Sequence, residues 1–150
     1  MTREVEMAVG FQVTFDAADP AALGRFWAEA LGYEEDKPPE GFANWEDWLR
    51  KSGIPEEHWN DAYALSDPDG AGPRIFIQKV PEPKTAKNRV HLDLDVGGGL
   101  SRPVEERREK VDSEADRLTT LGASRLRAAE ERGEYWIVMQ DPEGNEFCLQ

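Results

Sequence analysis

The sequence has a single cysteine, Cys148, and no long run of apolar residues. One cysteine excludes an intramolecular disulfide framework and a zinc site built on paired cysteines. A transmembrane helix needs about 20 consecutive apolar residues, and the N-terminal stretch MTREVEMAVGF lacks the apolar centre of a signal peptide. We therefore expect a cytoplasmic protein that has no membrane partner.

Basic residues are also scarce. The chain carries 18 Lys and Arg against 31 Asp and Glu, which gives a net charge of −13. Negative charge of this size repels phosphate backbones, so nucleic acid is not an expected partner. Hydrophobic residues make up 39% of the 150 positions, which is enough to bury the core of one domain. We expect residues 1–150 to form a single domain.

Two stretches of the chain alternate strictly between apolar and polar residues. The first is FQVTFD at residues 11–16, which places Phe11 on the apolar face, and the second is VHLDLDV at residues 90–96. Strict alternation predicts a half-buried strand with one polar face. Each stretch is followed by apolar residues at helical spacing, and both predicted helices end in Leu-Gly, at Gly32 and at Gly122.

The two halves of the chain share a further motif. A DPDG turn at residues 67–70 and a DPEG turn at residues 141–144 each precede an expected last strand. The matching order of elements predicts a duplicated βαβββ unit, with modules at residues 8–80 and 90–150 and a linker at residues 81–89. We expect an α+β fold in which two curved mixed sheets enclose a cleft between polar faces.

Residues 38–60 interrupt the first module. This aromatic insertion contains Trp45, Trp48 and Trp59. Large planar side chains beside a cleft can stack on a ring-shaped or hydrophobic ligand. They can equally anchor the insertion to the rest of the domain, because an insertion needs apolar contacts of its own. Both interpretations stay open.

The duplication and its motifs resemble the vicinal oxygen chelate superfamily. The most telling pieces are DPAALGRFWAEALGYE at residues 19–34 and EYWIVMQDPEGNEFCLQ at residues 134–150. They are similar to the glyoxalase-like branch of that superfamily, the glyoxalase, bleomycin resistance and dioxygenase type. The resemblance covers nearly the whole chain, and it implies two modules around a cleft that holds a small molecule.

The resemblance also implies a divalent metal, held by one side chain from the first strand and one from the last strand of each module. The matching positions are Gln12, Gln78, His91 and Cys148. Relatives of this kind normally carry glutamate in the two last strands, and Gln78 and Cys148 replace both glutamates. Two amides, one imidazole and one thiol form a weak ligand set for a hard cation, so we do not favour a bound divalent metal.

His91 and Cys148 carry the remaining chemistry of the predicted cleft. Asp93 shares a strand face with His91 and can orient its ring, so His91 is a candidate general base or ligand. It can also be a hydrogen-bonded residue of the cavity. Cys148 needs a stabilised thiolate to act as a nucleophile, and we expect Glu146, two residues away, to raise its pKa instead. We expect a buried, inert thiol.

These observations predict a protein that binds a small organic molecule between its two modules, without the usual metal. The alternative is a metal-dependent lyase, isomerase or dioxygenase with His91 as the catalytic residue. We expect a homodimer, because paired modules in this superfamily close a cleft either within one chain or between two. The sequence itself does not decide between these two arrangements. The residues expected to contact the ligand are Gln12, Thr14, Gln78, Asp93, Trp45, Trp48, Trp59 and Glu146.

Overall fold

The computed structural model describes residues 8–150 of the chain. They form two four-stranded sheets, with the strand orders β1-β4-β3-β2 and β5-β8-β7-β6. In each sheet the first strand pairs in parallel with the fourth, and the other neighbouring strands are antiparallel. This architecture confirms the predicted α+β fold with two tandem βαβββ modules.

The first helix of the first module ends at the Leu-Gly pair that the sequence predicts. The Asp19 side chain accepts a hydrogen bond from the backbone N–H of Ala22, and Gly32 adopts a left-handed conformation with φ 70° at the end of the same helix. The elements of this module are β1 (Val13–Ala17), α1 (Pro20–Leu31), β2 (Glu34–Glu35), α2 (Trp45–Lys51), the 3-10 turn η1 (Glu56–His58), β3 (Ala62–Ser66) and β4 (Ile75–Lys79).

The second module repeats this order without the insertion. Its helix is longer than the first, and the buried face of that helix includes Val111, Ala115 and Leu118. The elements are β5 (Asp93–Leu94), α3 (Val104–Thr120), β6 (Ser124–Glu131), β7 (Glu134–Gln140) and β8 (Glu146–Leu149).

Both alternating stretches form shorter strands than the sequence predicts. Phe11 is 75% exposed, because β1 begins only at Val13, opposite the first residue of β4. Val90 is 82% exposed, and only Asp93 and Leu94 pair as a strand with the short β8. The alternation therefore extends beyond the partner strands that hold each segment in the sheet.

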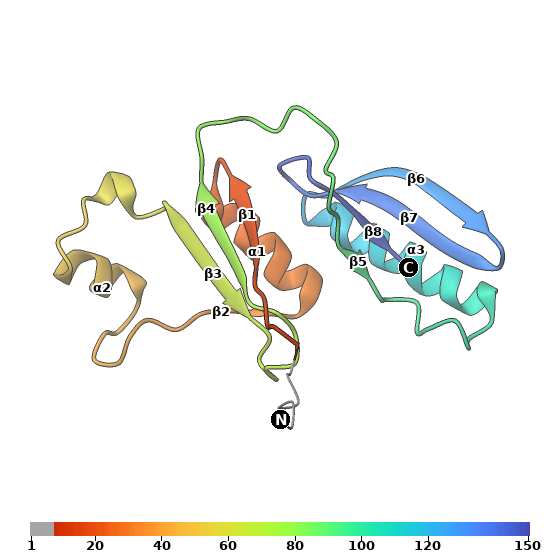
Figure 1. The fold of residues 1–150 in the computed structure, drawn as a ribbon, viewed down its shortest axis with the longest axis horizontal. Coiled ribbons are helices and arrows are strands. Elements are labelled where there is room, and N and C mark those ends of the chain that lie inside the picture. Colours follow the sequence, from red (N-terminus) through yellow and green to blue (C-terminus); the bar gives the residue numbers. More distant parts are fainter. Residues whose placement is uncertain (1–7) are drawn as a thin grey trace, which may run out of the picture.

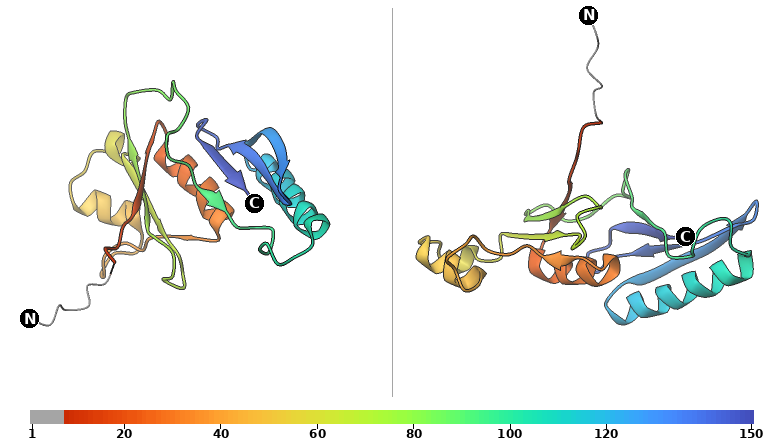
Figure 2. Two further views of the ribbon diagram at one scale, coloured as in Figure 1. Left: turned by 45° about the vertical axis from the view of Figure 1, so that its right-hand side comes forward. Right: turned by 90° about the horizontal axis from the view of Figure 1, so that it is seen from below.

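The two helices that cover the sheets leave the opposite faces uncovered. Helices α1 and α3 lie on the same side of the two sheets (Figure 2). The linker arches from β4 to β5, and β1 and β5 form the inner edges of the sheets (Figure 1). We call the side away from the helices the open face. Within residues 8–150, no helix is long and apolar enough to cross a membrane.

The two modules are joined through Trp27 of α1. Its indole is only 1% exposed, and its ring centroid lies 5.0 Å from that of Phe147 in β8. Its Nε1 donates a hydrogen bond of 3.0 Å to the buried carboxylate of Asp141. Asp141 also accepts hydrogen bonds from the backbone N–H of Glu143 and from both nitrogens of Asn145. A buried charge needs such a complete set of donors.

The DPEG turn adds a second contact between the modules. Glu143 accepts hydrogen bonds from the backbone N–H groups of Ala18 and Asp19, just before α1. Its counterpart in the repeat, the DPDG turn, has no such role in the described structure. There Asp67 accepts hydrogen bonds from Asp69 and Gly72 of its own loop. The duplicated turns therefore differ in what they hold together.

Replacing Asp141 by alanine is expected to lower the free energy of unfolding by about 3 kcal/mol, because the buried Trp27 N–H and three other N–H groups lose their acceptor. Asp67→Ala is the matched control in the duplicated turn, and we expect a clearly smaller loss there. Urea unfolding followed by circular dichroism measures both variants. Equal losses would contradict the role of Asp141 as the link between the modules.

Candidate functional site

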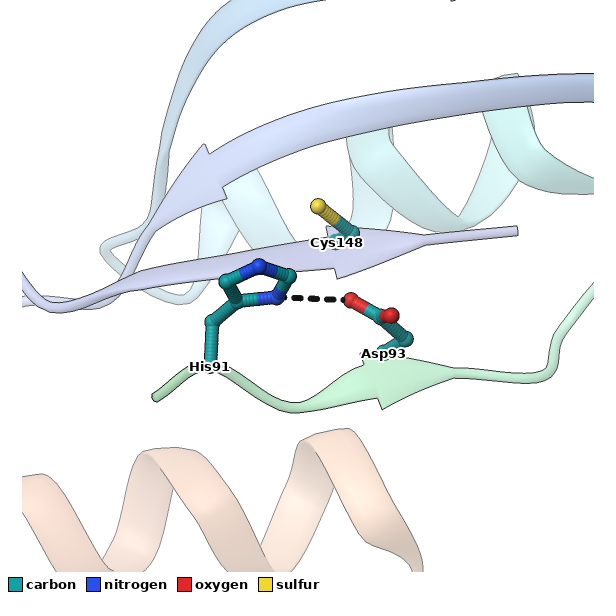
Figure 3. Close-up of side chains that lie close together, drawn as sticks. All are labelled: His91, Asp93 and Cys148. Carbon is teal, nitrogen blue, oxygen red and sulfur yellow. Dashed lines mark hydrogen bonds and ion pairs between the residues drawn. The ribbon is translucent and has the colours of Figure 1, made fainter. Parts of the chain in front are cut away.

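Three side chains with metal-binding or catalytic chemistry meet on the open face of the second sheet. Asp93 in β5 lies opposite Cys148 in β8, and His91 precedes Asp93 by two residues. All three point to the same side of the sheet (Figure 3), and one ligand atom from each lies within 4.8 Å of the others. The His91 Nδ1 and Asp93 Oδ1 atoms are 2.9 Å apart, so Asp93 orients the ring as the sequence predicts.

Cys148 is the sulfur ligand of this cluster, and its environment opposes ionisation. Burial raises the pKa of the Cys148 thiol, and the negative charge of Asp93 raises that pKa further. The expectation that Glu146 exerts this charge effect is wrong. Asp93 exerts it, because the parallel pairing of β5 with β8 places Asp93 directly beside the thiol.

Glu146 instead holds the linker. One of its carboxylate oxygens accepts a 2.9 Å hydrogen bond from the backbone N–H of Asn88, and Lys84 forms an ion pair with it at 3.2 Å. The hydrogen bond from Asn88 lowers the pKa of Glu146, and Lys84 adds to this effect. The side chain is only 12% exposed. Glu146 therefore fixes the linker against the edge of the cleft.

The two glutamines at the ends of β4 and β8 occupy equivalent positions in the repeat. The Gln78 side-chain amide donates to Asp16 at 2.8 Å, and the Gln150 amide donates to Asp95 at 2.9 Å. Asp16 and Asp95 are also equivalent, because FQVTFD matches VHLDLD. Each glutamine thus ties the last strand of its module to the first.

This register changes which residue of the first module corresponds to Cys148. Asp93 lies opposite Cys148, and Thr14, the counterpart of Asp93, lies opposite Phe76. By this register Phe76, rather than Gln78, is the counterpart of Cys148. A phenyl ring offers no metal ligand, so the first module presents no strong ligand at this position.

Gln12, the counterpart of His91, forms its hydrogen bonds within the first module. Its Oε1 accepts from Arg74 at 3.1 Å, and its Nε2 donates to Thr14 at 3.4 Å. A guanidinium beside the amide oxygen opposes the approach of a metal cation. The side chains that gather as possible ligands are therefore those of the second module, and a nitrogen, an oxygen and a sulfur ligand suit zinc better than magnesium or manganese.

A cleft of about 840 Å³ lies between the two modules. Its walls come from β1, the beginning of α1, the linker and the DPEG turn. Of the residues expected to contact a ligand, Thr14 and Glu146 line this cleft, and so does His91, the candidate catalytic residue. Gln12, Gln78 and Asp93 do not line it.

The three tryptophans of the insertion line a different cavity. It has a volume of about 1000 Å³ and lies between the insertion, β3 and β4. We call this cavity the flap pocket. Its lining includes Trp45, Trp48 and Trp59 together with Ala62, Ala64 and Phe76. The structure thus separates two groups of residues that were expected to share one cleft.

Two contacts at the candidate site were not predicted from the sequence, Asp93 with Cys148 and Lys84 with Glu146. Both join segments that lie more than 50 residues apart, and their proximity depends on strand register. Alternation shows which face a residue occupies, but it does not show which residue lies opposite it on the next strand. The repeat was the available signal, because aligning IFIQ with FCLQ gives the register directly.

Residues 12–150 match the family described as Glyoxalase-like domain, so the chain belongs to this family. Together with the solved structures of the same fold, the match defines a glyoxalase-like protein of the vicinal oxygen chelate superfamily. A comparison with curated proteins finds no significant match.

Three solved structures illustrate the shared fold. A variant of the fosfomycin resistance protein FosX from Listeria monocytogenes, complexed with Mn(II) and a dihydroxypropylphosphonic acid, gives a TM-score of 0.62 at 17% identity over 97% of this chain and 92% of that chain. An enzyme of the glyoxalase/bleomycin resistance protein/dioxygenase family from Burkholderia phytofirmans PsJN gives 0.60 at 17% identity over 92% and 94%. The bleomycin-binding protein from Streptomyces verticillus, complexed with copper(II)-bleomycin, gives 0.51 at 18% identity over 97% and 98%. At these identities the similarity shows the fold alone.

The thiol of Cys148 is expected to react slowly with iodoacetamide at pH 8, because its raised pKa keeps the thiolate fraction small. Asp93→Asn removes one cause of that shift, so the pH midpoint of the reaction should move to a lower value and the rate at pH 8 should rise. The matched control is Glu146→Gln, which should leave the midpoint unchanged. If Glu146→Gln moves the midpoint and Asp93→Asn does not, then Glu146, and not Asp93, is the carboxylate that raises the pKa of Cys148.

Proposed function

We propose that the protein binds a small organic molecule in the cleft between its two modules. The observation that carries this proposal is the cleft itself, which has about 840 Å³ of space and uncovered polar side chains on its walls. Ligand pockets in proteins commonly have volumes of about 300 to 1000 Å³ and a few well-placed polar groups. The Thr14 hydroxyl and the His91 imidazole supply such groups from the two modules.

The solved structures support this proposal by the ligands that they hold. The Streptomyces verticillus protein is a bleomycin-binding protein in complex with copper(II)-bleomycin, and the Listeria monocytogenes variant holds a dihydroxypropylphosphonic acid.

Two exposed apolar residues support the expected homodimer. Phe11 and Val90 are equivalent in the repeat, and a second copy of the chain can cover both. The cytoplasmic location stays a prediction from the sequence.

A thermal-shift screen of small organic molecules is expected to find compounds that raise the melting temperature. A ligand at a hundredfold excess over its Kd stabilises the folded state by about 2.7 kcal/mol. Thr14→Trp fills the cleft and should abolish the shift, whereas Thr120→Trp, at the exposed end of α3, should retain it. The proposal fails if no compound stabilises the protein, or if both tryptophan variants respond like the wild type.

A metal-dependent activity is the second candidate function. It is favoured by one observation, the meeting of His91, Asp93 and Cys148 within 4.8 Å. A zinc ion held there would act as a Lewis acid that polarises a substrate oxygen. The Asp93 contact to His91 Nδ1 leaves the opposite ring nitrogen for such an ion, an arrangement that carboxylates often impose on metal-binding histidines.

The metal-dependent function requires about one zinc ion per chain after dialysis against zinc, as measured by plasma mass spectrometry. His91→Ala should then remove the metal, because it deletes the only imidazole of the cluster. His58→Ala is the matched control, since His58 lies in the insertion and pairs with Asp61. If the wild type binds no zinc, or if the His91→Ala variant still binds it, the metal-dependent function is ruled out. The function proposed for the metal-free cleft then remains.

A further inference from the structure

The aromatic insertion folds without a core of its own. Helix α2 begins after Asn44, whose side chain accepts a 2.8 Å hydrogen bond from the backbone N–H of Asp47. None of the seven residues of α2 is fully buried. Trp45 and Trp48 are therefore only half-buried, although large aromatic side chains in a stable insertion normally pack against a core. A hydrogen bond from its indole N–H holds Trp45, and Trp48 packs against the Trp45 ring.

The indole rings of the insertion are fixed at their polar edges. Trp45 Nε1 donates to the backbone oxygen of Asp36 at 2.6 Å, and Trp59 Nε1 donates to that of Ile54 at 2.9 Å. The rings of Trp45 and Trp48 meet edge to face, with centroids 5.5 Å apart. These contacts use the N–H groups of Trp45 and Trp59 and one ring edge of the Trp45–Trp48 pair, and Arg50 lies over the Trp59 ring. The remaining ring surface lines the flap pocket. The rings are held in place before any ligand arrives.

The opposite wall of the flap pocket is built from small side chains. Ala62 and Ala64 of β3 lie on the open face, because Tyr63 between them points to α1, where its ring fills the space beside Gly24. Ala64 lies opposite Phe76 of β4. The two alanines and Phe76 form the floor of the pocket. The Arg74 guanidinium lies over the Phe76 ring at 5.6 Å, so the alanines are the uncovered part of this floor. The space between the floor and the indoles is about 1000 Å³. Planar ligands suit this lining, because a flat ring system makes its largest contact with indole faces.

The charges around the flap pocket are predominantly negative. Six carboxylates line it, against three Lys and Arg side chains. Arg74 and Asp36 pair with each other at 2.8 Å, which leaves five carboxylates against two basic side chains. Arg50 shows that a planar cation suits these rings, because its guanidinium lies over the Trp59 ring at 5.5 Å. The carboxylates that line the pocket are Glu35, Asp36, Glu46, Glu56, Glu57 and Asp61.

We propose that the flap pocket is a second binding site, which takes a planar organic cation. The aromatic part of the ligand stacks between the indoles and the alanine floor, and its positive charge is balanced by the surrounding carboxylates. A neutral planar molecule lacks the attraction to the carboxylates and binds more weakly, and a planar anion is repelled by them. This site does not depend on the ligand of the cleft between the modules, because the two cavities share no lining residue.

Calorimetric titration with two acridines tests the proposal on the intact chain. The cation 9-aminoacridine should bind saturably, and acridine-9-carboxylate, which has the same ring system and a negative charge, should not. Trp48→Ala removes one stacking surface and should weaken binding of 9-aminoacridine about tenfold or more. Ala64→Phe, which fills the floor and leaves the tryptophans in place, should weaken it similarly.

Two control variants distinguish binding in the flap pocket from binding elsewhere on the chain. Trp136→Ala removes an indole from β7 of the second module and should leave the affinity within about twofold, as should His91→Ala in the cleft. Circular dichroism confirms that each variant is folded. The proposal is overturned if the anion binds as well as the cation, if Trp48→Ala and Ala64→Phe both bind normally, or if His91→Ala abolishes binding and so places the dye in the cleft.

Discussion

The buried pairing of Trp27 with Asp141 is the constraint on which the arrangement of the two modules depends. A carboxylate that is 3% exposed is stable only while all its donors stay in place, and one of these donors belongs to the other module. The indole itself packs against Phe147, so the same residue supplies both an apolar and a polar contact. Any rotation of one module against the other breaks both contacts together.

This constraint also determines the cleft. Trp27, Glu143 and Asn145 all line the cleft, and each takes part in the contact between the modules or lies beside it. The position of the Thr14 hydroxyl relative to the His91 ring is therefore fixed by residues that need not touch a ligand. Binding groups on rigid elements lose little entropy when a ligand arrives.

The two modules also differ in what their polar side chains bind. In the first, Gln12 bonds to Arg74 and Gln78 to Asp16, whereas the second brings three different ligand atoms together.

Local features were predictable from the sequence and long-range ones were not. Helix α1 ends at Gly32 as the Leu-Gly pattern predicts, since the end of a helix depends on residues within one turn. The repeat predicted the order of the strands. The neighbour of Cys148 and the separation of the tryptophans from the cleft were missed, because both depend on register and on how segments far apart in the chain pack together.

The difference between the two duplicated turns bears on where the second cavity lies. Asp141 binds Trp27 of the other module, whereas Asp67 accepts hydrogen bonds only from residues of its own loop among the described contacts. The tryptophan-rich segment lies in the same module as the DPDG turn, and residues 38–60 supply none of the groups that bind Asp141 or Glu143. The second cavity is thus built without any residue of the contact between the modules.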